Sequence, residues 1–557
     1  MKKTGKLKES HSTMRWVYKR TKGFLPWIIG VCILNVFSSV LVIALAKFSK
    51  DVINAGTEKS FEKIALCTVF LFGSALLQIF TDGITSMLNV RISGKMTISM
   101  RDYMFSSVLK KRYRGVFDHH SGDLLNRFTT DIDQVISSSV SLIPNICSIL
   151  TKIIVGIWAL LIQNYIFAVI VVVLGFLLPF LGRKISRKYK YLHKEVSRTE
   201  GLSRSFLQES FANIVVIKTF ESERPILNKL NDYMNQNLKI KIKRNFVFVL
   251  ISMCLNSFFT FGYYVVLVWG ASQIAAGAIT YGTLYYYLQL ISILRSPLQS
   301  VSGIIPQYYS MIASAERLIE LEDIGDEASP VAGDTLKELK ESFENITVSS
   351  MSFGYGNETV LKNCNAEIQR GKITAITGES GGGKSTLFKI LLGLYEPTSG
   401  SVKFNGEIPI DASTRGMFSY VPQGNMILSC TIKENLTLCD PDVSDEQIER
   451  AAKAADIYDF IMTLPDKFDT KLSERGAGLS EGQIQRISIA RALLFDAPIL
   501  LLDESTSALD EQTETAVLSN IKSMTDKTVI FITHRNTSIT VCDNIIHVEN
   551  KEFVRIK

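Results

Sequence analysis

The sequence lacks the cysteine spacing of a disulfide framework or a zinc site. Its eight cysteines are scattered between positions 32 and 542, and none forms a C-x-x-C pair. Because disulfide-rich and zinc-binding domains usually show paired cysteines, we expect these thiols to serve as packing groups. An acidic excess is also missing, since 61 lysines and arginines outnumber 54 aspartates and glutamates and give a net charge of +7.

The basic residues do not form the pattern of a nucleic-acid surface. They flank long apolar runs, which is typical of residues that orient membrane segments. The N-terminal stretch before the first apolar run is strongly basic, which predicts an N-terminus in the cytoplasm. That first apolar run is too long for a cleavable signal peptide and lacks a small-residue cleavage pattern, so we expect none.

Long apolar runs are abundant in the front half of the chain. A bilayer core of about 30 Å needs roughly 20 mostly apolar residues in a helix. Buried helices of a soluble protein would have to be apolar on all sides at this length and number, so we expect membrane-spanning helices instead. The six predicted spans begin near Phe24, Ile64, Val140, Ile166, Phe246 and Thr283.

The predicted domains follow from a change in composition along the chain. Residues 1–321 form a membrane domain whose long basic connections, 91–138 and 183–244, lie on the cytoplasmic side with the C-terminal half. Residues 322–342 form a linker that begins with acidic residues, proline and glycine. Residues 343–557 mix charge, short β-like runs and turn residues as a soluble α/β domain does. We therefore expect a multi-pass protein of the cytoplasmic membrane.

A glycine-rich loop, GESGGGKST, follows the strand-like run ITAIT and precedes the helix-like run LFKILLGL. It matches G-x-x-x-x-G-K-[ST], the pattern of a phosphate-binding loop. The glycines allow backbone amides to turn toward phosphate oxygens at a helix N-terminus. Lys384 would contact the β- and γ-phosphates, and Ser385 would ligate magnesium. The predicted nucleotide-binding residues of the loop are Gly378, Glu379, Ser380, Gly381, Gly382, Gly383, Lys384, Ser385 and Thr386.

Two adjacent carboxylates end the apolar run PILLLDE, residues 498–504. Such a run is typical of a buried parallel strand, whose carboxyl end would lie beside the phosphate-binding loop. Asp503 would then hold magnesium, and Glu504 would polarise the attacking water as a general base. Paired acids at a strand end are often caps or solvated residues, but a magnesium nucleotide site requires an acid at this place.

The run LSEGQIQRISIARALL, residues 479–494, lies just before PILLLDE. Together with the phosphate-binding loop, it resembles the nucleotide-binding domain of ABC transporters. The whole chain is similar to a half-transporter of the ABC exporters, in which a six-span membrane domain precedes one ATPase domain. This resemblance implies ATP and Mg²⁺ as cofactors. It also implies a dimer, formed with a second copy of the chain or with a related half-transporter.

The resemblance implies roles for individual residues outside the loop. Tyr355 matches the aromatic residue that stacks on adenine. Gln423 matches the glutamine that touches magnesium and responds to the membrane domain, and Asp510 matches the loop between the two sites. His534 matches the histidine that contacts the γ-phosphate and orients the water. The signature residues, which contact the nucleotide bound by the opposite subunit, are Ser480, Gly482 and Gln483.

Together these residues predict a complete site for ATP hydrolysis. Glu504, His534 and Gln423 form its catalytic group, because they would surround the attacking water and the γ-phosphate. The predicted metal ligands are Ser385, Gln423 and Asp503.

The resemblance also predicts transport by alternating access. Residues 117–133 and 207–223 resemble the coupling loops that dock on ATPase domains. ATP binding would close the cytoplasmic side of the dimer, and hydrolysis would reset it. We expect export of an amphipathic drug, peptide or lipid. One subunit of a heterodimeric exporter and an ATP-gated channel or sensor on the same fold are the alternatives.

The substrate site has no motif. Asp82 and Lys152 lie in or beside the second and third spans, where ionisable groups are functional candidates. They either line the translocation path, lie at a membrane edge or pair structurally, because the sequence does not define the span ends. Two aromatic clusters, residues 258–264 and 285–290, either line an amphipathic cavity or face membrane lipid.

Overall fold

The computed structural model divides the chain into two compact units. The helical unit comprises Met1–Ser106 and Ser121–Glu322, and the α/β unit comprises Ser107–His120 and Asp323–Lys557. The structure describes the backbone of residues 2–119, 121–163, 165–356, 358–379, 381–424, 426–473, 476, 478–506, 508–524, 526–533, 535 and 542–555. Side chains are described for the same residues except 2–11, 121, 166–187, 190, 193, 251, 255, 298, 299, 301, 302, 305 and 555.

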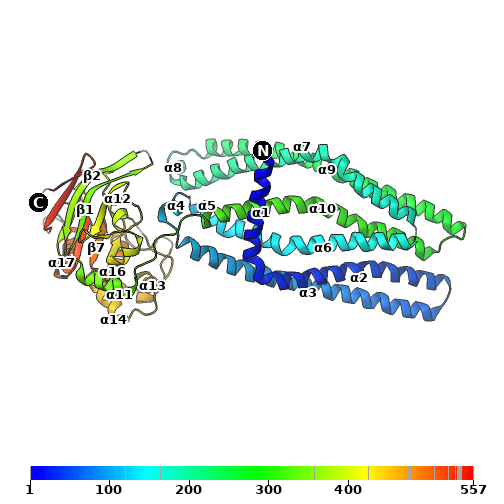
Figure 1. Cartoon of the computed structure of the whole chain (residues 1–557), viewed down its shortest axis with the longest axis horizontal. Coiled ribbons are helices and arrows are strands. Elements are labelled where there is room, and N and C mark those ends of the chain that lie inside the picture. Colours follow the sequence, from blue (N-terminus) through cyan, green and yellow to red (C-terminus); the bar gives the residue numbers. More distant parts are fainter. Residues whose placement is uncertain are drawn as a thin grey trace. The chain divides into compact units, whose positions relative to one another are not determined.

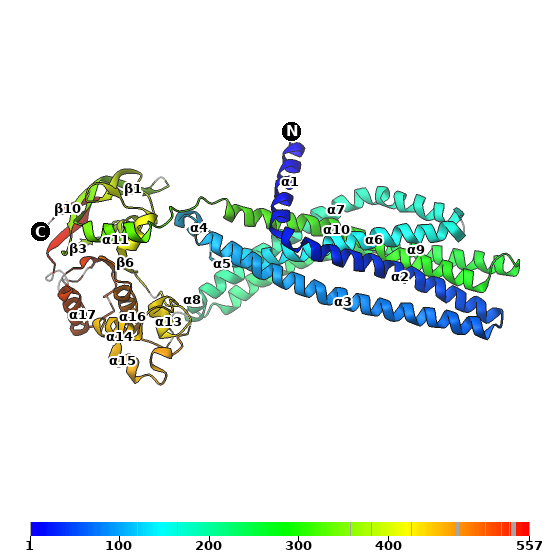
Figure 2. The same ribbon diagram turned by 60° about the horizontal axis from the view of Figure 1, so that its bottom comes forward.

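Long helices build the helical unit. In both views the long helices run along the length of the unit, except α1, which crosses them (Figures 1 and 2). The long helices are α1 (Lys2–Thr21), α2 (Leu25–Thr57), α3 (Phe61–Val108), α6 (Ile132–Gln163), α7 (Tyr165–Ala212), α9 (Glu223–Ala275) and α10 (Tyr281–Glu322). Shorter elements connect them: η1 (Lys22–Phe24), α5 (Ser121–Asn126), the π-helical η2 (Arg127–Asp131) and α8 (Ile214–Thr219).

Four helical stretches among the described residues are long and apolar enough to cross a membrane. They are Ser12–Thr57, Phe61–Val108, Gly122–Gln163 and Glu223–Ala275. These stretches contain the predicted spans that begin near Phe24, Ile64, Val140 and Phe246. The predicted spans near Ile166 and Thr283 fall in α7 and α10, which are not among the four. The total of six spans therefore stays a prediction.

One face of α10 packs into the apolar core of the helical unit. Tyr286, Leu290 and Leu294 are buried there in a cluster shared with α2, α6 and α9. Gly156 of α6 permits the close approach, because a Cβ at this position would lie 2.8 Å from Cδ2 of Leu294. Small residues allow helices to approach in this way where lipid provides no hydrophobic driving force. The opposite face of α10 is left outside this core.

A buried ion-pair network fixes the last turns of α10 against η2 at the start of α6. Asp131 is 1% exposed and accepts hydrogen bonds from Ser314 Oγ at 2.9 Å and Arg317 Nε at 2.7 Å. Arg127 Nη1 lies 3.0 Å from a carboxylate oxygen of Glu320. Because a buried charge is costly without partners, the buried Asp131 and Arg127 depend on these contacts.

The two ionisable residues expected near the second and third spans lie on different helices. Asp82 is on α3, and its Oδ1 accepts a hydrogen bond from Ser38 Oγ of α2 at 2.7 Å. Lys152 is on α6. A role for either residue in translocation stays a prediction.

Two sheets form the α/β unit. The antiparallel sheet has the order β2-β1-β4-β5, and the larger sheet has the order β10-β9-β3-β8-β7-β6. All neighbours in the larger sheet are parallel except β10 and β9. The strands are β1 (Asn345–Tyr355), β2 (Glu358–Gln369), β3 (Ile373–Gly378), β4 (Ser399–Phe404), β5 (Ile408–Pro409), β6 (Phe418–Val421), β7 (Ile499–Asp503), β8 (Thr528–Ile532), β9 (Asn544–Glu549) and β10 (Glu552–Arg555).

Helices cover the larger sheet, whose inner strands β7 and β8 are buried along their whole length. Their near-continuous apolar sequences are typical of parallel strands covered on both faces. The helical elements of the unit are α4 (Tyr113–Phe117), α11 (Gly333–Ser342), α12 (Lys384–Leu391), η3 (Ala412–Met417), α13 (Ile432–Thr437), α14 (Asp445–Ala454), α15 (Tyr458–Thr463), η4 (Lys467–Asp469), α16 (Glu481–Leu494) and α17 (Glu511–Ser523).

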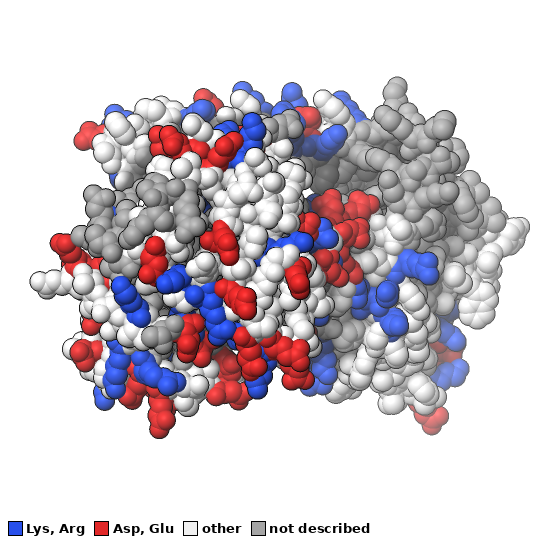
Figure 3. Space-filling model, turned by 60° about the vertical axis from the view of Figure 1, so that its left-hand side comes forward, with Lys and Arg blue, Asp and Glu red and all other residues white. Residues whose placement is uncertain are grey.

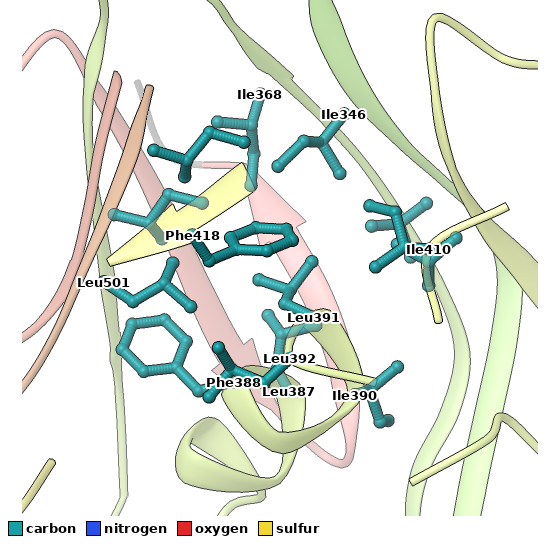
Figure 4. Close-up of a cluster of buried hydrophobic side chains, with 14 of the residues drawn as sticks. Ile346, Ile368, Leu387, Phe388, Ile390, Leu391, Leu392, Ile410, Phe418 and Leu501 are labelled. Carbon is teal, nitrogen blue, oxygen red and sulfur yellow. The ribbon is translucent and has the colours of Figure 1, made fainter. Parts of the chain in front are cut away.

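The main core of the α/β unit contains side chains from both sheets and from α12. Figure 4 shows Ile346 and Ile368 of the antiparallel sheet near Phe418 and Leu501 of the parallel sheet. Phe388 of α12 is fully buried in the same cluster. Because α12 begins at the glycine-rich loop, this apolar packing fixes the helix that positions the loop.

The surface of the α/β unit carries charges of both signs. In the view of Figure 3, lysine and arginine side chains are interspersed with aspartate and glutamate side chains.

The segment 107–120, which contains α4, packs with the α/β unit although it lies between helices of the other unit in sequence. Arg112 N donates to Gly325 O at 2.9 Å, and Glu327 N donates to Lys110 O at 2.8 Å. Residues 121–133 of the predicted first coupling loop, 117–133, belong to the helical unit, and the coupling role of this segment stays a prediction.

Candidate active site

The glycine-rich loop joins β3 to α12 at one edge of the larger sheet. Strands β3, β8, β7 and β6 are parallel neighbours, so their carboxyl ends meet at this edge. Asp503 is the last residue of β7, and Gln423 lies just after β6. The fold therefore gathers polar residues that are distant in the sequence.

Two glycines of the loop adopt backbone conformations that other residues rarely take. Gly378 has φ of +139°, and a Cβ there would lie 2.5 Å from the carbonyl oxygen of Val548. Gly383 has φ of +97°, and its Cβ would lie 2.9 Å from Cδ2 of Leu361. Only glycine fits such positions without strain. The shape of the loop thus depends on the glycines that define its motif.

The side chain of Lys384 is held inside the loop. It is 5% exposed, and Nζ donates to the carbonyl oxygens of Gly378 and Glu379, both at 2.8 Å. Burial lowers the pKa of Lys384, while the nearby carboxylates of Glu504 and Asp503 oppose that change. An anionic phosphate oxygen is a stronger partner for an ammonium group than a carbonyl oxygen is. The loop therefore holds a positive charge suited to phosphate.

A pair of oxygen ligands lies beside the lysine. Ser385 Oγ donates to Asp503 Oδ1 at 3.1 Å, and the Tyr420 hydroxyl donates to Oδ2 at 3.3 Å. Burial raises the pKa of Asp503, and the two hydrogen bonds oppose the rise. Burial also raises the pKa of Tyr420, so its phenol remains protonated and can donate. Hydroxyl and carboxylate oxygens suit Mg²⁺, which takes one or two protein ligands besides phosphates.

Glu504 has a strained backbone and a defined side-chain partner. Its φ of +49° lies in the left-handed region, which non-glycine residues seldom adopt. Its N–H donates to Ile532 O at 3.2 Å, and Gln423 Nε2 donates to its Oε2 at 2.6 Å. Strained residues of this kind cluster at functional sites. The geometry thus brings Gln423 and Glu504 together, and their catalytic roles stay predictions.

Tyr355 presents its ring at the end of β1. The side chain is 39% exposed, and its hydroxyl lies 3.4 Å from Thr386 Oγ1. Tyr395 supports the ring edge-on with centroids 5.5 Å apart, and Tyr395 also meets Tyr113 of α4 at 5.8 Å. Burial raises the pKa of Tyr395 to about 12. An exposed aromatic face held by other rings can stack on a purine base.

The predicted signature residues lie at the N-terminus of α16. Ser480 is the N-cap, and its hydroxyl accepts a hydrogen bond from Gln483 N at 3.3 Å. A Cβ on Gly482 would lie 3.0 Å from Ala508 O, so the helix approaches that backbone closely. Among the described residues, no hydrogen bond joins this helix start to the glycine-rich loop. Ser480 and Gln483 instead bond to each other at the start of their own helix.

Asp510 caps α17 through hydrogen bonds from Thr513 N and Oγ1, both at 2.9 Å. These bonds lower the pKa of Asp510. The predicted site residues Ser380 and His534 lie outside the described residues. Thr533 and Arg535, which flank His534 in the sequence, follow β8 at the same sheet edge.

Sequence reasoning missed three residues that organise the site. Tyr420 holds Asp503, and Tyr395 supports Tyr355. Glu514 is buried and accepts hydrogen bonds from Thr506 Oγ1 and Arg535 Nη1, both at 2.9 Å. It thereby joins the segments that follow β7 and β8. A tyrosine three residues before Gln423 was the one available signal, because the other contacts depend on the tertiary fold.

This fold and site define a membrane-bound P-loop ATPase. The family model "ABC transporter transmembrane region" matches residues 27–298, and the model "ABC transporter" matches residues 361–507. The chain is 30% identical to "Putative multidrug export ATP-binding/permease protein" of Staphylococcus aureus over 95% of this chain and 93% of that protein. It is 29% identical to "Probable ABC transporter ATP-binding/permease protein" of Haemophilus influenzae over 82% of this chain and 84% of that protein.

One solved structure, of a bacterial Atm1-family ABC exporter with ATP bound, has the same fold. The TM-score is 0.80 at 22% identity, over 95% of this chain and 94% of the other. The chain belongs to the ABC transporter family and has the half-transporter layout of its exporters. It is an ATP-binding protein whose ATP hydrolysis is coupled to transport, and the predicted exporter fold is confirmed.

Proposed function

We propose that the chain works as a dimer in the cytoplasmic membrane and exports an amphipathic substrate, with Mg²⁺ and ATP bound between the two ATPase domains. The N-terminus and the α/β unit lie in the cytoplasm. Support for export comes from the family and from a relative whose name includes multidrug export. The basic segments beside the apolar helices support the orientation.

The observation that carries the dimer is that, among the described residues, no hydrogen bond joins the two nucleotide motifs of one chain. Ser480 at the start of α16 is exposed and caps its own helix. A γ-phosphate held by Lys384 needs further donors to neutralise its charge during phosphoryl transfer. The helix start carrying Ser480, Gly482 and Gln483 supplies such donors when it comes from a second subunit. Symmetry then gives two sites in a homodimer.

An exposed apolar surface at α8 also supports a dimer. Phe211, Ile214, Val215, Val216 and Phe220 are all exposed, although they lie in a cytoplasmic connection rather than in a predicted span. Contiguous apolar side chains of this kind usually mark a contact with another protein. A partner subunit would cover them as part of the second coupling loop.

The metal-binding residues of the proposal are Ser385, Asp503 and Gln423. Ser385 Oγ and Asp503 Oδ1 are already 3.1 Å apart, and both are the hard oxygen ligands that Mg²⁺ prefers. When bound with ATP, the ion neutralises charge on the phosphates. Lys384 holds the β- and γ-phosphates, and the ring of Tyr355 stacks on adenine.

Glu504 acts as the general base. Its carboxylate is held by Gln423 at 2.6 Å, so it can accept a proton from a water aligned with the γ-phosphate. We assign a role in contacting the γ-phosphate to His534 from the family resemblance alone. Asp510 lies in the loop between the two sites. Closure of the dimer completes the site, and reopening after hydrolysis returns the cytoplasmic side to its starting state.

Nanodiscs that hold one or two copies of the chain test the proposed dimer. Discs should be sorted by copy number, and magnesium-dependent ATPase activity should be measured per chain. We expect activity in two-copy discs and none in one-copy discs. Equal activity per chain in one-copy discs would contradict the shared site. Two-copy discs that bind ATP but show no ATPase activity would instead indicate a heterodimer with a related half-transporter.

A further inference from the structure

A hollow of about 240 Å³ lies between α9 and α10 of the helical unit. It is lined by Phe259, Thr260, Tyr263, Tyr264, Ile291, Ser292 and Arg295. The lining thus combines aromatic rings and hydroxyl groups with one cationic side chain. Binding sites for small molecules are commonly apolar hollows with a few placed polar groups.

Arg295 lies deep within the predicted sixth span. It is about 21 Å along α10 from Tyr281, on a rise of 1.5 Å per residue, and the bilayer core is about 30 Å thick. Its guanidinium donates a hydrogen bond to Asn256 Oδ1 of α9. Across the part of the chain that the structure describes, it has no ion pair with an acidic residue. An arginine in this setting is costly and usually marks a substrate or ion pathway.

The same side of α10 carries a row of polar residues. Tyr285, Ser292, Ser296 and Ser300 recur at helical spacing and are exposed, whereas Leu290 and Leu294 pack into the apolar core. Polar side chains within a membrane segment generally face a water-filled path or another helix rather than lipid. The row therefore places the hollow on the polar side of α10.

We propose that this hollow binds the anionic head group of an amphiphile, with Arg295 as the residue that selects negative charge. The inference rests on the proposed export of amphipathic substrates and specifies their charge. A carboxylate, phosphate or sulfonate oxygen would accept charge-assisted hydrogen bonds from the guanidinium, which has donors beyond the one used by Asn256. The rings of Phe259, Tyr263 and Tyr264 would contact the adjacent apolar part of the ligand.

Matched probes with one apolar chain separate charge selection from general hydrophobic binding. The probes are radiolabelled decyl phosphate, decyl glucoside and decyltrimethylammonium, each below its micelle-forming concentration. Equilibrium binding is measured without ATP on the full chain in zwitterionic nanodiscs. We expect the native chain to bind decyl phosphate most tightly. Arg295→Gln should weaken that binding about tenfold or more while leaving decyl glucoside binding within about twofold.

Arg295→Lys and Arg198→Gln serve as controls. Arg295→Lys keeps the positive charge and should retain binding of decyl phosphate within about threefold of native. Arg198→Gln removes a positive charge from an exposed side chain on α7 and should have no effect. Unchanged decyl phosphate binding in Arg295→Gln would overturn the proposal. An equal loss of decyl phosphate and decyl glucoside binding would also overturn it, because the charge of Arg295 would then not distinguish the anionic probe from the neutral one.

Anionic lipid added to the discs distinguishes the source of the ligand. If such lipid displaces decyl phosphate from the native chain but not from Arg295→Gln, a bilayer lipid occupies the hollow. If it does not displace the probe, a soluble amphiphile is the ligand, and both results support an anion site. Since this assay requires no ATP, its result is independent of whether the chain hydrolyses ATP or exports a substrate.

Discussion

The two units of the molecule carry their chemistry in different ways. In the α/β unit, Ser385 donates a hydrogen bond to Asp503, and Lys384 donates to a carbonyl oxygen of the glycine-rich loop. Each of these three residues belongs to a sequence motif. In the helical unit, Asp82 and Arg295 each form a hydrogen bond with a side chain of a neighbouring helix and belong to no motif. Phosphate chemistry requires fixed backbone geometry and charge, whereas substrate handling in a membrane requires only a polar group in an apolar setting.

The largest effect should come from the carboxylate proposed as base. Glu504→Gln keeps the side-chain shape but removes the proton acceptor, so turnover should fall by about 10²–10⁴. ATP binding should persist, because Lys384 and the loop are unchanged. Steady-state ATPase rates and nucleotide binding in nanodiscs measure the two effects. Glu446→Gln on exposed α14 is the control, and turnover retained by Glu504→Gln would remove Glu504 from its role.

Loss of the loop lysine should weaken ATP binding itself as well as ATP hydrolysis. Lys384→Ala removes the ammonium that Gly378 and Glu379 hold in the loop, and ATP affinity should fall by about 100-fold. Equilibrium binding of a fluorescent ATP analogue measures the change. Lys522→Ala on the exposed face of α17 removes the same charge elsewhere. Native affinity in Lys384→Ala would contradict the phosphate-binding assignment.

The aromatic residue at the adenine position should have an intermediate effect. Tyr355→Ala removes the stacking face, and ATP affinity should fall by about tenfold. Tyr355→Phe keeps the ring but loses the hydroxyl near Thr386, and its affinity should stay close to native. The same binding titration compares the two variants. If both lose affinity equally, the hydroxyl rather than the ring makes the contact.

The smallest predicted effect concerns stability. Burial raises the pKa of Asp503, so its ionised form destabilises the folded chain above that pKa. Asp503→Asn should therefore raise the melting temperature of the nucleotide-free chain slightly at pH 8. This advantage should shrink as pH falls through the raised pKa toward the ordinary value of about 3.9, where native Asp503 is protonated. Thermal unfolding in EDTA at several pH values tests the sign.

The sequence revealed more of the α/β unit than of the helical unit. Glycines with positive φ, the lysine and the strand-end acids follow from local motifs, because the backbone conformation requires those residue types. Tyr395 and Glu514 act through contacts between distant segments, which no local pattern encodes. Arg295 stands in an apolar run, where one charge does not reveal its partner or the neighbouring hollow.

The most direct test of the account is ATP-driven accumulation in sealed proteoliposomes. Magnesium and ATP are added outside, so that only chains with an outward-facing ATPase domain can work. A labelled amphiphile that stimulates ATPase activity serves as the tracer. We predict that native chain concentrates the tracer in the lumen above its outside level, and that Glu504→Gln does not. If ATP merely lets the tracer equilibrate across the membrane, the chain is a gated channel and the account of an exporter is contradicted.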